Sequence, residues 1–250
     1  IKRTDYSFIV IEDLELLPFF FYKFKNTKII FDAREYYPSQ NEESIIFRLF
    51  EKPQRNFVCK TYLNKCFSVI TVSPSIAKEY DKNFNINTKV IRSIPNYFDL
   101  RVNKTDPKTI RIVHHGMAKK NRKIENMINL MEYLDERFSL DLYLKGDQVY
   151  INSLKKLAKD KKTSIKNPVA YDQIIPMLNK YDVGLFYVEP TTFNLKKCLP
   201  NKLFEFIQAR LAVAIGPSTD MLNLIEEYNC GIYSDDFKLK NLAKKINKLS

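Results

Sequence analysis

Cysteine, histidine and glycine are scarce in this 250-residue chain. It has four cysteines without any Cys-x-x-Cys spacing, five glycines, and only two histidines, the adjacent His114 and His115. This residue set lacks the grouped ligands of a zinc site, so we expect no metal and read the cysteines as free thiols of a reducing compartment. Neither the Gly-x-Gly-x-x-Gly dinucleotide fingerprint nor the phosphate-binding loop of nucleoside triphosphatases occurs.

A long apolar run is also missing. The longest uncharged apolar run near the start covers residues 16–22, and lysines follow it directly. A helix that spans a bilayer needs about 20 apolar residues. The sequence therefore predicts no signal peptide and no membrane span, and a cytoplasmic location.

The composition is that of a folded and basic protein. Apolar residues make up 45% of the chain, enough for one large domain or two ordinary ones. Lysine and arginine exceed acidic residues by 17 to 12 in residues 1–105 and by 24 to 17 in the rest. This even excess favours a general attraction to anions, such as phosphorylated small molecules or an anionic membrane surface. Nucleic acid is the least expected partner, because no basic strip interleaved with aromatic residues is visible.

Strand and helix patterns alternate along the chain, which predicts an α/β protein with largely parallel sheets. In the first part, the strands are expected at 6–11, 28–32, 67–72 and 89–93, and the helices at 14–24, 44–64 and 75–84. Pro53 is expected to kink or split the long middle helix. Either Ser73 or Ser75 is expected to cap the third helix.

A segment without apolar periodicity, residues 98–109, separates this part from a second one. The second part has expected strands at 110–114, 140–145, 164–166, 183–188 and 231–233, plus the short apolar strand that ends near Ile215. Its helices are expected at 126–136, 149–159, 173–179, 219–227 and 239–249, with one more that opens at Pro200. Six strands suffice for a doubly wound domain and four fall short of one. We therefore predict an incomplete first domain over residues 1–102 and a complete second domain over 103–250.

Ligands of doubly wound sheets bind beyond the carboxyl ends of the strands, so the loops after strands are the candidate sites. After the first strand of the second part comes Gly116, followed by four basic residues among the five from Lys119 to Lys123. This loop is a plausible cradle for a diphosphate. Residues 144–147 repeat the strand-then-glycine pattern, and residues 167–171, which include Val169 and Tyr171, offer backbone groups and an aromatic ring at the same edge.

The helix that begins at Pro200 is apolar almost all round, so Glu205 within it is unusual. A buried carboxylate needs a hydrogen-bonding partner. Two alternatives stay open for this residue: it caps a neighbouring loop, or it binds a ligand at the start of the helix.

The motif Pro200-Asn201-Lys202-Leu203-Phe204-Glu205-Phe206 resembles the Pro-Asn-Lys-Leu-Phe-Glu-Tyr signature of GT-B-fold glycosyltransferases of bacterial surface-polysaccharide assembly. Supporting segments follow in the family's order. They are residues 31–38, similar to Asp-Ala-His-Glu-Tyr-x-Pro, residues 94–96, His115-Gly116 with Arg122, residues 169–171, and residues 182–185. The resemblance covers nearly the whole chain.

The resemblance implies two Rossmann-like domains and a retaining, metal-independent transfer of a sugar from a nucleoside-diphosphate sugar to a glycan or lipid-linked acceptor. Glu205 would bind the ribose hydroxyls, while Arg122 and Lys202 would neutralise the diphosphate as it leaves. Gly116, Lys119, Val169, Tyr171, Asn201 and Leu203 would complete the donor site. The nucleotide sugar is a co-substrate, so no cofactor is implied, and the acceptor would bind to the first domain. The basic balance and the Phe19-Phe20-Phe21 cluster favour association with the inner face of the plasma membrane, and the alternative for this cluster is a place in the core.

Three positions depart from the family pattern. Lys197 stands where many relatives carry a second glutamate, Arg34 replaces a histidine, and Arg210 replaces a glycine that follows the helix, where a left-handed conformation is strained. Two other functions stay open beside transfer: a nucleotide-sugar epimerase of the same fold, and a non-catalytic nucleotide-binding scaffold.

Overall fold

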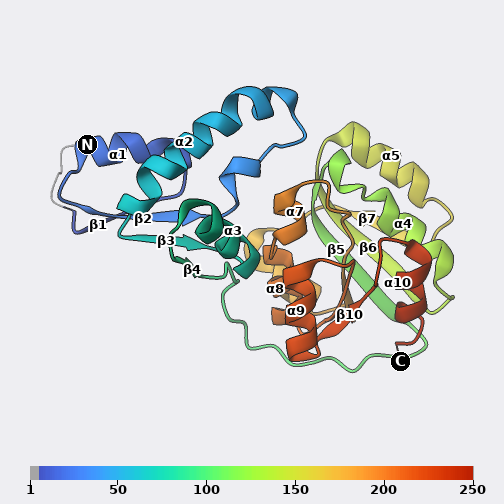
Figure 1. The fold of residues 1–250 in the computed structure, drawn as a ribbon. Helices are drawn as coiled ribbons and strands as arrows, with labels where there is room; N and C mark the ends of the chain where they lie inside the picture. Colours follow the sequence, from blue (N-terminus) through green and yellow to red (C-terminus); the bar gives the residue numbers. More distant parts are fainter. Residues whose placement is uncertain (1–5, 250) are drawn as a thin grey trace. The chain divides into compact units, whose positions relative to one another are not determined.

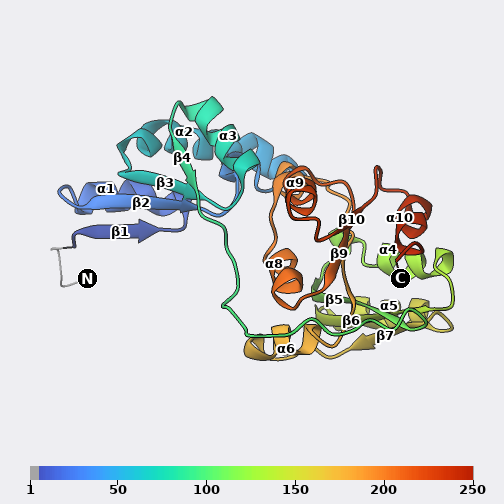
Figure 2. The same cartoon turned by 90° about the horizontal axis from the view of Figure 1, so that it is seen from below.

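The computed structural model describes residues 6–249, which form two compact units (Figures 1 and 2). The first unit contains the described residues up to Ser93 together with Pro190–Leu199. The second contains Ile94–Glu189 and the described residues from Pro200 onward. Each unit has a parallel β-sheet, so the predicted α/β class is confirmed.

The first unit has a four-stranded parallel sheet in the order β1-β2-β3-β4. Its strands are β1 (Phe8–Ile11), β2 (Lys28–Ala33), β3 (Ser68–Thr71) and β4 (Thr88–Val90). All four lie where the β-branched and aromatic runs predict them, although the last strand ends at Val90 and not at residue 93.

Helices precede, connect and follow these strands. They are η1 (Leu14–Leu16), α1 (Leu17–Lys23), η2 (Tyr37–Ser39), the π-helical turn η3 (Phe47–Glu51), α2 (Lys52–Tyr62), η4 (Leu63–Lys65), α3 (Pro74–Phe84) and α7 (Phe193–Lys197). Pro53 does not break the long helix. It lies in the first turn of α2, where η3 ends, so its missing N–H falls at the change of helix type. Of the two expected caps for α3 it is Ser73, whose Oγ accepts from the Ile76 N–H at 3.4 Å.

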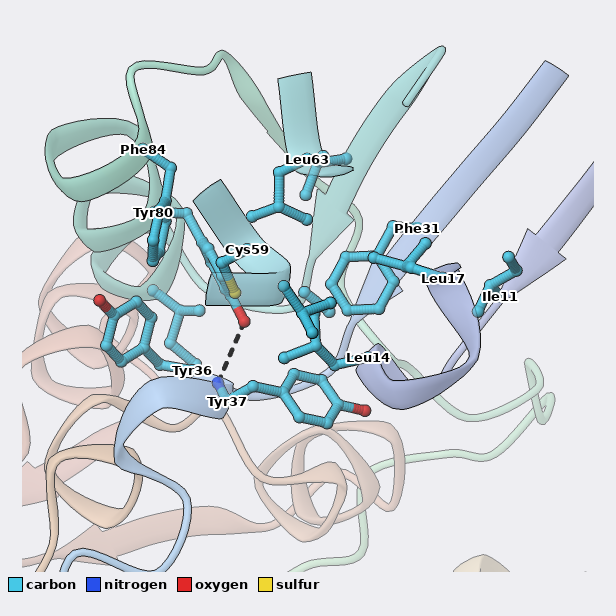
Figure 3. Packing of buried hydrophobic residues seen from close by; sticks show 14 of the residues in the cluster. Ile11, Leu14, Leu17, Phe31, Tyr36, Tyr37, Cys59, Leu63, Tyr80 and Phe84 are labelled. Atoms are coloured by element: carbon cyan, nitrogen blue, oxygen red, sulfur yellow. Dashed lines mark hydrogen bonds between the residues drawn. The ribbon is translucent and has the colours of Figure 1, made fainter. Parts of the chain in front are cut away.

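The core of the first unit lies between one face of the sheet and α1, α2 and α3 (Figure 3). Phe31 and Tyr80 are fully buried there. The Tyr80 hydroxyl joins two segments, because it accepts from the Tyr37 N–H at 3.0 Å and donates to the Glu35 carbonyl at 3.0 Å. Burial raises the pKa of Tyr80 far above its usual value, so the hydroxyl keeps its proton.

Residues 190–199 come from late in the sequence but pack in the first unit. The Asn194 amide accepts from the Tyr36 N–H at 2.7 Å and donates to the Tyr36 carbonyl at 3.1 Å. The Ser73 hydroxyl donates to the Lys197 carbonyl at 2.8 Å, and Phe193 packs against the core. The sequence pattern does not predict α7 or its place in this unit.

The second unit has a six-stranded parallel sheet in the order β10-β9-β8-β5-β6-β7. Its strands are β5 (Ile110–Ala118), β6 (Phe138–Gly146), β7 (Thr163–Lys166), β8 (Val183–Phe186), β9 (Ala212–Ile215) and β10 (Gly231–Tyr233). This is the doubly wound topology expected from six alternating strands. β5 runs four residues beyond its expected end at His114, so His115 and Gly116 belong to the strand.

Two helical layers cover this sheet (Figures 1 and 2). The helices are η5 (Lys120–Arg122), α4 (Glu125–Leu130), η6 (Met131–Tyr133), α5 (Gln148–Ala158), η7 (Tyr171–Gln173), α6 (Ile174–Leu178), α8 (Asn201–Gln208), α9 (Thr219–Tyr228) and α10 (Leu239–Ile246). α4 packs against α5 and α10 on one side, and α6 packs against α8 on the other. Arg210, after α8, has the left-handed φ of 66° that its position in the motif implies, and its Nε donates to the Leu100 carbonyl at 3.2 Å.

Candidate functional site

The candidate site lies where the strand order of the second unit reverses. The chain passes from β5 outward through β6 and β7, then returns to the other side of β5 as β8. β5 and β8 are therefore neighbours, paired at Ile112 with Val183 and at Val113 with Gly184. In doubly wound sheets, ligands bind beyond the carboxyl ends of the strands at such a point.

Two histidines and a glycine lie in the last part of β5. Both His114 and His115 are buried, and each ring has separate contacts. The His114 Nδ1 lies 2.8 Å from the Leu185 carbonyl of β8, while the His115 ring packs edge-on against Phe206 of α8. Gly116 has a φ of +134°, a conformation that side chains rarely adopt.

The start of α8 faces this part of β5. A Cβ at Gly116 would lie 2.7 Å from the Lys202 Nζ, so the glycine leaves room for the lysine. The ammonium also lies 5.5 Å from the centre of the Phe186 ring at the end of β8. Two residues of the predicted diphosphate cradle, Gly116 and Lys202, are thus brought together.

Glu205 lies one turn further along α8 and is buried, with 6% of its surface exposed. Its Oε2 is 3.0 Å from the His115 Nε2, although the two groups are not aligned as a hydrogen bond. Sequence reasoning missed this contact, because it left the partner of Glu205 open between a loop and a ligand. The adjacent His114 and His115 could have indicated this contact, because successive residues of a strand point to opposite faces of the sheet and one of the two must face α8.

Gly184 explains why α8 lies so close to the sheet. A Cβ at this position of β8 would lie 2.3 Å from the Phe206 Cγ, a distance that real Cβ atoms do not show. The aromatic ring therefore occupies the space of the missing side chain. This packing fixes the distance of the helix from the strand, and with it the positions of Lys202 and Glu205.

The basic loop after β5 forms η5 and a left-handed residue rather than leading straight into a helix. Lys119 is exposed and precedes η5, whereas Arg122 is half-buried at its end. Lys123 has a φ of 46°, and its Nζ pairs with Glu189 at 3.0 Å. Burial and the charge of Lys202 lower the pKa of His114 most, and the charge of Arg122 adds the smallest contribution.

The remaining predicted residues lie around the same edge of the sheet. Val169 is half-buried in the turn after β7, and Tyr171, which opens η7, is 74% exposed. Asn201 is exposed as the first residue of α8, while the Leu203 side chain is fully buried in the core. The N–H of Leu203 donates to the Pro200 carbonyl at 3.0 Å. Leu203 thus has only its backbone near the helix start.

The strand-then-glycine pattern makes residues 144–147 a candidate ligand loop, but in the structure this segment ends a strand and caps a helix. Gly146 ends β6, and the Asp147 carboxylate caps α5 by accepting from the Tyr150 N–H at 2.7 Å. A pocket of about 130 Å³ lies beside it, between β6, α5 and β7. Lys145, Lys155 and Lys166 are among its lining residues.

His114 is held in its neutral form. Burial lowers its pKa well below the usual 6.5, the positive charge of Lys202 lowers it further, and the contact with Leu185 opposes this only in part. The Nε2 of the same ring is buried and has no hydrogen-bond partner among the described residues. The ring is therefore a neutral neighbour of the cations.

The neutral state of His114 predicts a pH-dependent stability. Below its unfolded pKa of about 6.5, His114 binds a proton only in the unfolded state, so folding stability falls as the pH is lowered. Between about pH 7.5 and 5.5 this residue alone lowers the free energy of unfolding by about 1.4 kcal/mol. Urea unfolding of the wild type and of His114→Gln at both pH values measures the difference. Equal losses in the two proteins contradict the prediction.

Within residues 6–249, no group of three or more histidine, cysteine, aspartate or glutamate side chains is arranged to hold a metal ion. No disulfide joins any of the four cysteines. Burial raises the pKa of Cys59 and of Cys66 to about 12, which keeps both thiols protonated.

Comparison with known proteins identifies the fold. No protein-family profile and no curated protein matches the sequence. Solved structures do match. HepE of Anabaena, in complex with UDP and glucose, superposes with a TM-score of 0.72 at 14% identity, over 96% of this chain and 67% of HepE. TarM of S. aureus, in complex with UDP and other ligands, gives 0.73 at 12% identity, over 97% of this chain and 48% of TarM.

WaaG, a glycosyltransferase involved in lipopolysaccharide biosynthesis, gives a TM-score of 0.65 at 11% identity, over 92% of this chain and 70% of WaaG. These proteins are GT-B glycosyltransferases. The chain therefore has the GT-B fold that the Pro200–Glu205 motif predicts. It spans about half of TarM and about two thirds of HepE.

Proposed function

We propose that this chain is a glycosyltransferase that takes a sugar from a nucleoside-diphosphate sugar. One observation carries the proposal: the first turns of α8 bring Lys202 beside Gly116 and Glu205 beside His115 at the switch point of the sheet. The motif residues thus gather a cation and a carboxylate where a doubly wound sheet binds nucleotides. The UDP held by HepE and TarM supports a nucleotide donor.

The chemistry follows from the charge that develops during transfer. The bond between the sugar carbon and the diphosphate oxygen breaks, and negative charge grows on that oxygen. Lys202, Arg122 and the N–H groups at the start of α8 supply positive charge for it without solvent reorganisation. Glu205 is proposed to accept hydrogen bonds from the ribose hydroxyls. We propose a metal-independent reaction, because these cations act on the leaving group. We propose that it retains the configuration of the sugar, as the resemblance of the Pro200–Glu205 motif implies.

The acceptor is proposed to be a glycan or a lipid-linked glycan of surface-polysaccharide biosynthesis. This fits a protein at the cytoplasmic face of the membrane, in peripheral contact with anionic lipid. The formal net charge of +12 favours such a surface. In the part of the chain that the structure describes, no helix has the length and apolar character needed to cross a bilayer.

Calorimetry with UDP and GDP tests the donor site directly. We expect the wild type to bind one of them and Glu205→Ala to bind it about 10- to 100-fold more weakly, because a charge-assisted hydrogen bond of about 1.5–3 kcal/mol is lost. Equal affinity in the two proteins removes Glu205 from the site.

The wild type, incubated with candidate nucleotide sugars and followed by mass spectrometry, separates the three activities. Transfer or hydrolysis of the sugar supports a glycosyltransferase. An isomerised nucleotide sugar indicates an epimerase, and nucleotide binding without turnover indicates a scaffold.

A further inference from the structure

The Glu205 side chain is buried in the second unit with a single polar neighbour. Only 6% of the residue is exposed. The described residues, 6–249, give its carboxylate one polar contact, in which its Oε2 lies 3.0 Å from the His115 Nε2. A buried carboxylate without a donor is costly, so a group that can donate to it decides how it is held.

The strand β5 determines which histidine reaches Glu205. Successive strand residues point to opposite faces of a sheet, so His114 and His115 cannot serve the same group. The His114 ring lies on one face, where its Nδ1 is 2.8 Å from the Leu185 carbonyl. The His115 ring lies on the face that α8 covers, and only this ring meets the carboxylate.

The Phe206 ring holds the imidazole of His115 in place. The two ring centres are 5.7 Å apart and the ring planes are perpendicular, at 90°. Phe206 is fully buried and occupies the space where a Cβ of Gly184 would lie. Because this ring has no space to turn aside, the edge contact limits the movement of the imidazole.

The free nitrogen of this imidazole suits a donor to Glu205. A neutral imidazole donates through Nε2 when that nitrogen carries the proton. The His115 Nε2 is buried and has no aligned hydrogen bond among the described residues. It already lies within hydrogen-bond distance of the Glu205 Oε2, so the pair lacks only alignment. Donation to one carboxylate oxygen leaves the other free to accept from a ligand.

We propose that His115 is a positioning residue that orients the Glu205 carboxylate toward the ribose hydroxyls of the donor nucleotide. His115 acts through Glu205 and needs no contact of its own with the nucleotide. A binding group whose orientation is fixed beforehand loses less freedom when the ligand arrives. The inference rests on the proposed function and names the residue on which selectivity for the ribose hydroxyls depends.

The affinity ratio between a nucleotide and its analogue without ribose hydroxyls tests the proposal. The nucleotide is UDP or GDP, whichever the wild type binds, and the analogue is its 2′,3′-dideoxy form. Calorimetry on the full 250-residue chain should show at least about tenfold tighter binding of the nucleotide, because the analogue leaves the carboxylate unpaired. The ratio is taken within one protein, so a general loss of affinity cancels.

Two substitutions of His115 separate hydrogen bonding from packing. His115→Phe keeps a ring against Phe206 but removes the donor, so the ratio should fall to within about twofold of one. His115→Gln removes the ring but keeps an N–H at a similar reach, so the ratio should stay within about threefold of the wild-type value. A ratio that survives in His115→Phe and is lost in His115→Gln shows a packing role and overturns the proposal.

Val113→Ala is the matched control for damage to the interior. Val113 is fully buried in β5, two positions before His115 and therefore on the same face. Its substitution creates a cavity without removing a polar group, so the ratio should remain within about twofold of the wild-type value. A ratio that falls as far as in His115→Phe contradicts a specific role of His115.

A second pair of variants covers the case in which His115→Phe does not fold. The amide of His115→Asn is one methylene shorter than that of His115→Gln, so it falls short of the carboxylate. The ratio should therefore fall in His115→Asn and persist in His115→Gln. Equal ratios in these two variants overturn the proposal.

The wild type separates a failure of this inference from a failure of the donor site. A wild type that binds neither UDP nor GDP, or that binds the analogue equally well, refutes the proposed contact of Glu205 with ribose and this inference with it. A wild type that discriminates, beside a His115→Phe variant that discriminates as strongly, keeps the donor site and refutes only the role of His115.

Discussion

Replacing Lys202 with methionine should weaken UDP binding about 10- to 100-fold, while the affinity for uridine should stay within about twofold. Methionine keeps an unbranched apolar stem for the contact with Phe186 and for the space above Gly116. It removes the ammonium charge that we propose acts on the diphosphate. The loss corresponds to a charge-assisted hydrogen bond of about 1.5–3 kcal/mol. Calorimetry with UDP and with uridine measures both affinities.

Lys180→Met is the control for the general effect of removing a positive charge. Lys180 is exposed and precedes β8, at the opposite end of the strand from Phe186. This variant should bind UDP like the wild type at ordinary ionic strength. If the two lysine variants lose UDP affinity equally, the effect comes from net charge and Lys202 has no specific role. If Lys202→Met loses affinity for uridine as well, the residue acts by packing.

Gly184→Ala should lower the free energy of unfolding by about 2–3 kcal/mol, a large effect for one methyl group. The added Cβ would lie 2.3 Å from the Phe206 Cγ and 2.6 Å from both Cδ atoms. Relief requires α8 to move away from β8, because the ring is fully buried and has no space to turn aside. Urea unfolding of the full chain measures the loss. Because α8 carries Lys202 and Glu205, the same variant should also bind UDP more weakly.

A double-mutant cycle with Phe206→Ala isolates this contact. Removing the ring costs about 3–5 kcal/mol by itself, but it vacates the space that a Cβ at Gly184 needs. Gly184→Ala should therefore cost at least about 1 kcal/mol less in the Phe206→Ala background. Strictly additive losses would show that the glycine is required for another reason than the ring.

The sequence predicts much of the second unit because its signals are local. The apolar strands and their alternation with helices suffice for the doubly wound sheet, and the run from Pro200 to Glu205 predicts both α8 and the GT-B fold. The same is true of Arg210, whose left-handed φ follows from its place after the helix. Roles proposed for Lys119, Val169, Tyr171 and Asn201 remain predictions, since their placement at one edge of the sheet does not show what they bind.

Other features depend on contacts between distant residues and have no local signal. His115 meets Glu205 across 90 positions of the sequence, and only the register of β5 and the close packing of α8 bring them together. The π-helical turn η3 preserves the apolar pattern of a helix, so periodicity alone does not distinguish it. Asn194 belongs to the first unit because its side chain forms hydrogen bonds with the backbone of Tyr36. No sequence pattern in residues 190–199 predicts these bonds.

The assignment of Pro190–Leu199 to the first unit affects how the chain can be divided. The polypeptide passes between the units three times, after Ser93, after Glu189 and after Leu199. One cleavage within residues 94–105, which lie outside helices and strands, therefore does not separate the units, because the later fragment contains the strands of the second unit and also α7 of the first. The first unit includes Pro190–Leu199, which follows most of the second unit in the sequence. The helix α8 of the second unit begins at Asn201, two positions after this segment ends. Neither unit can be excised as one uninterrupted stretch of sequence with all its parts.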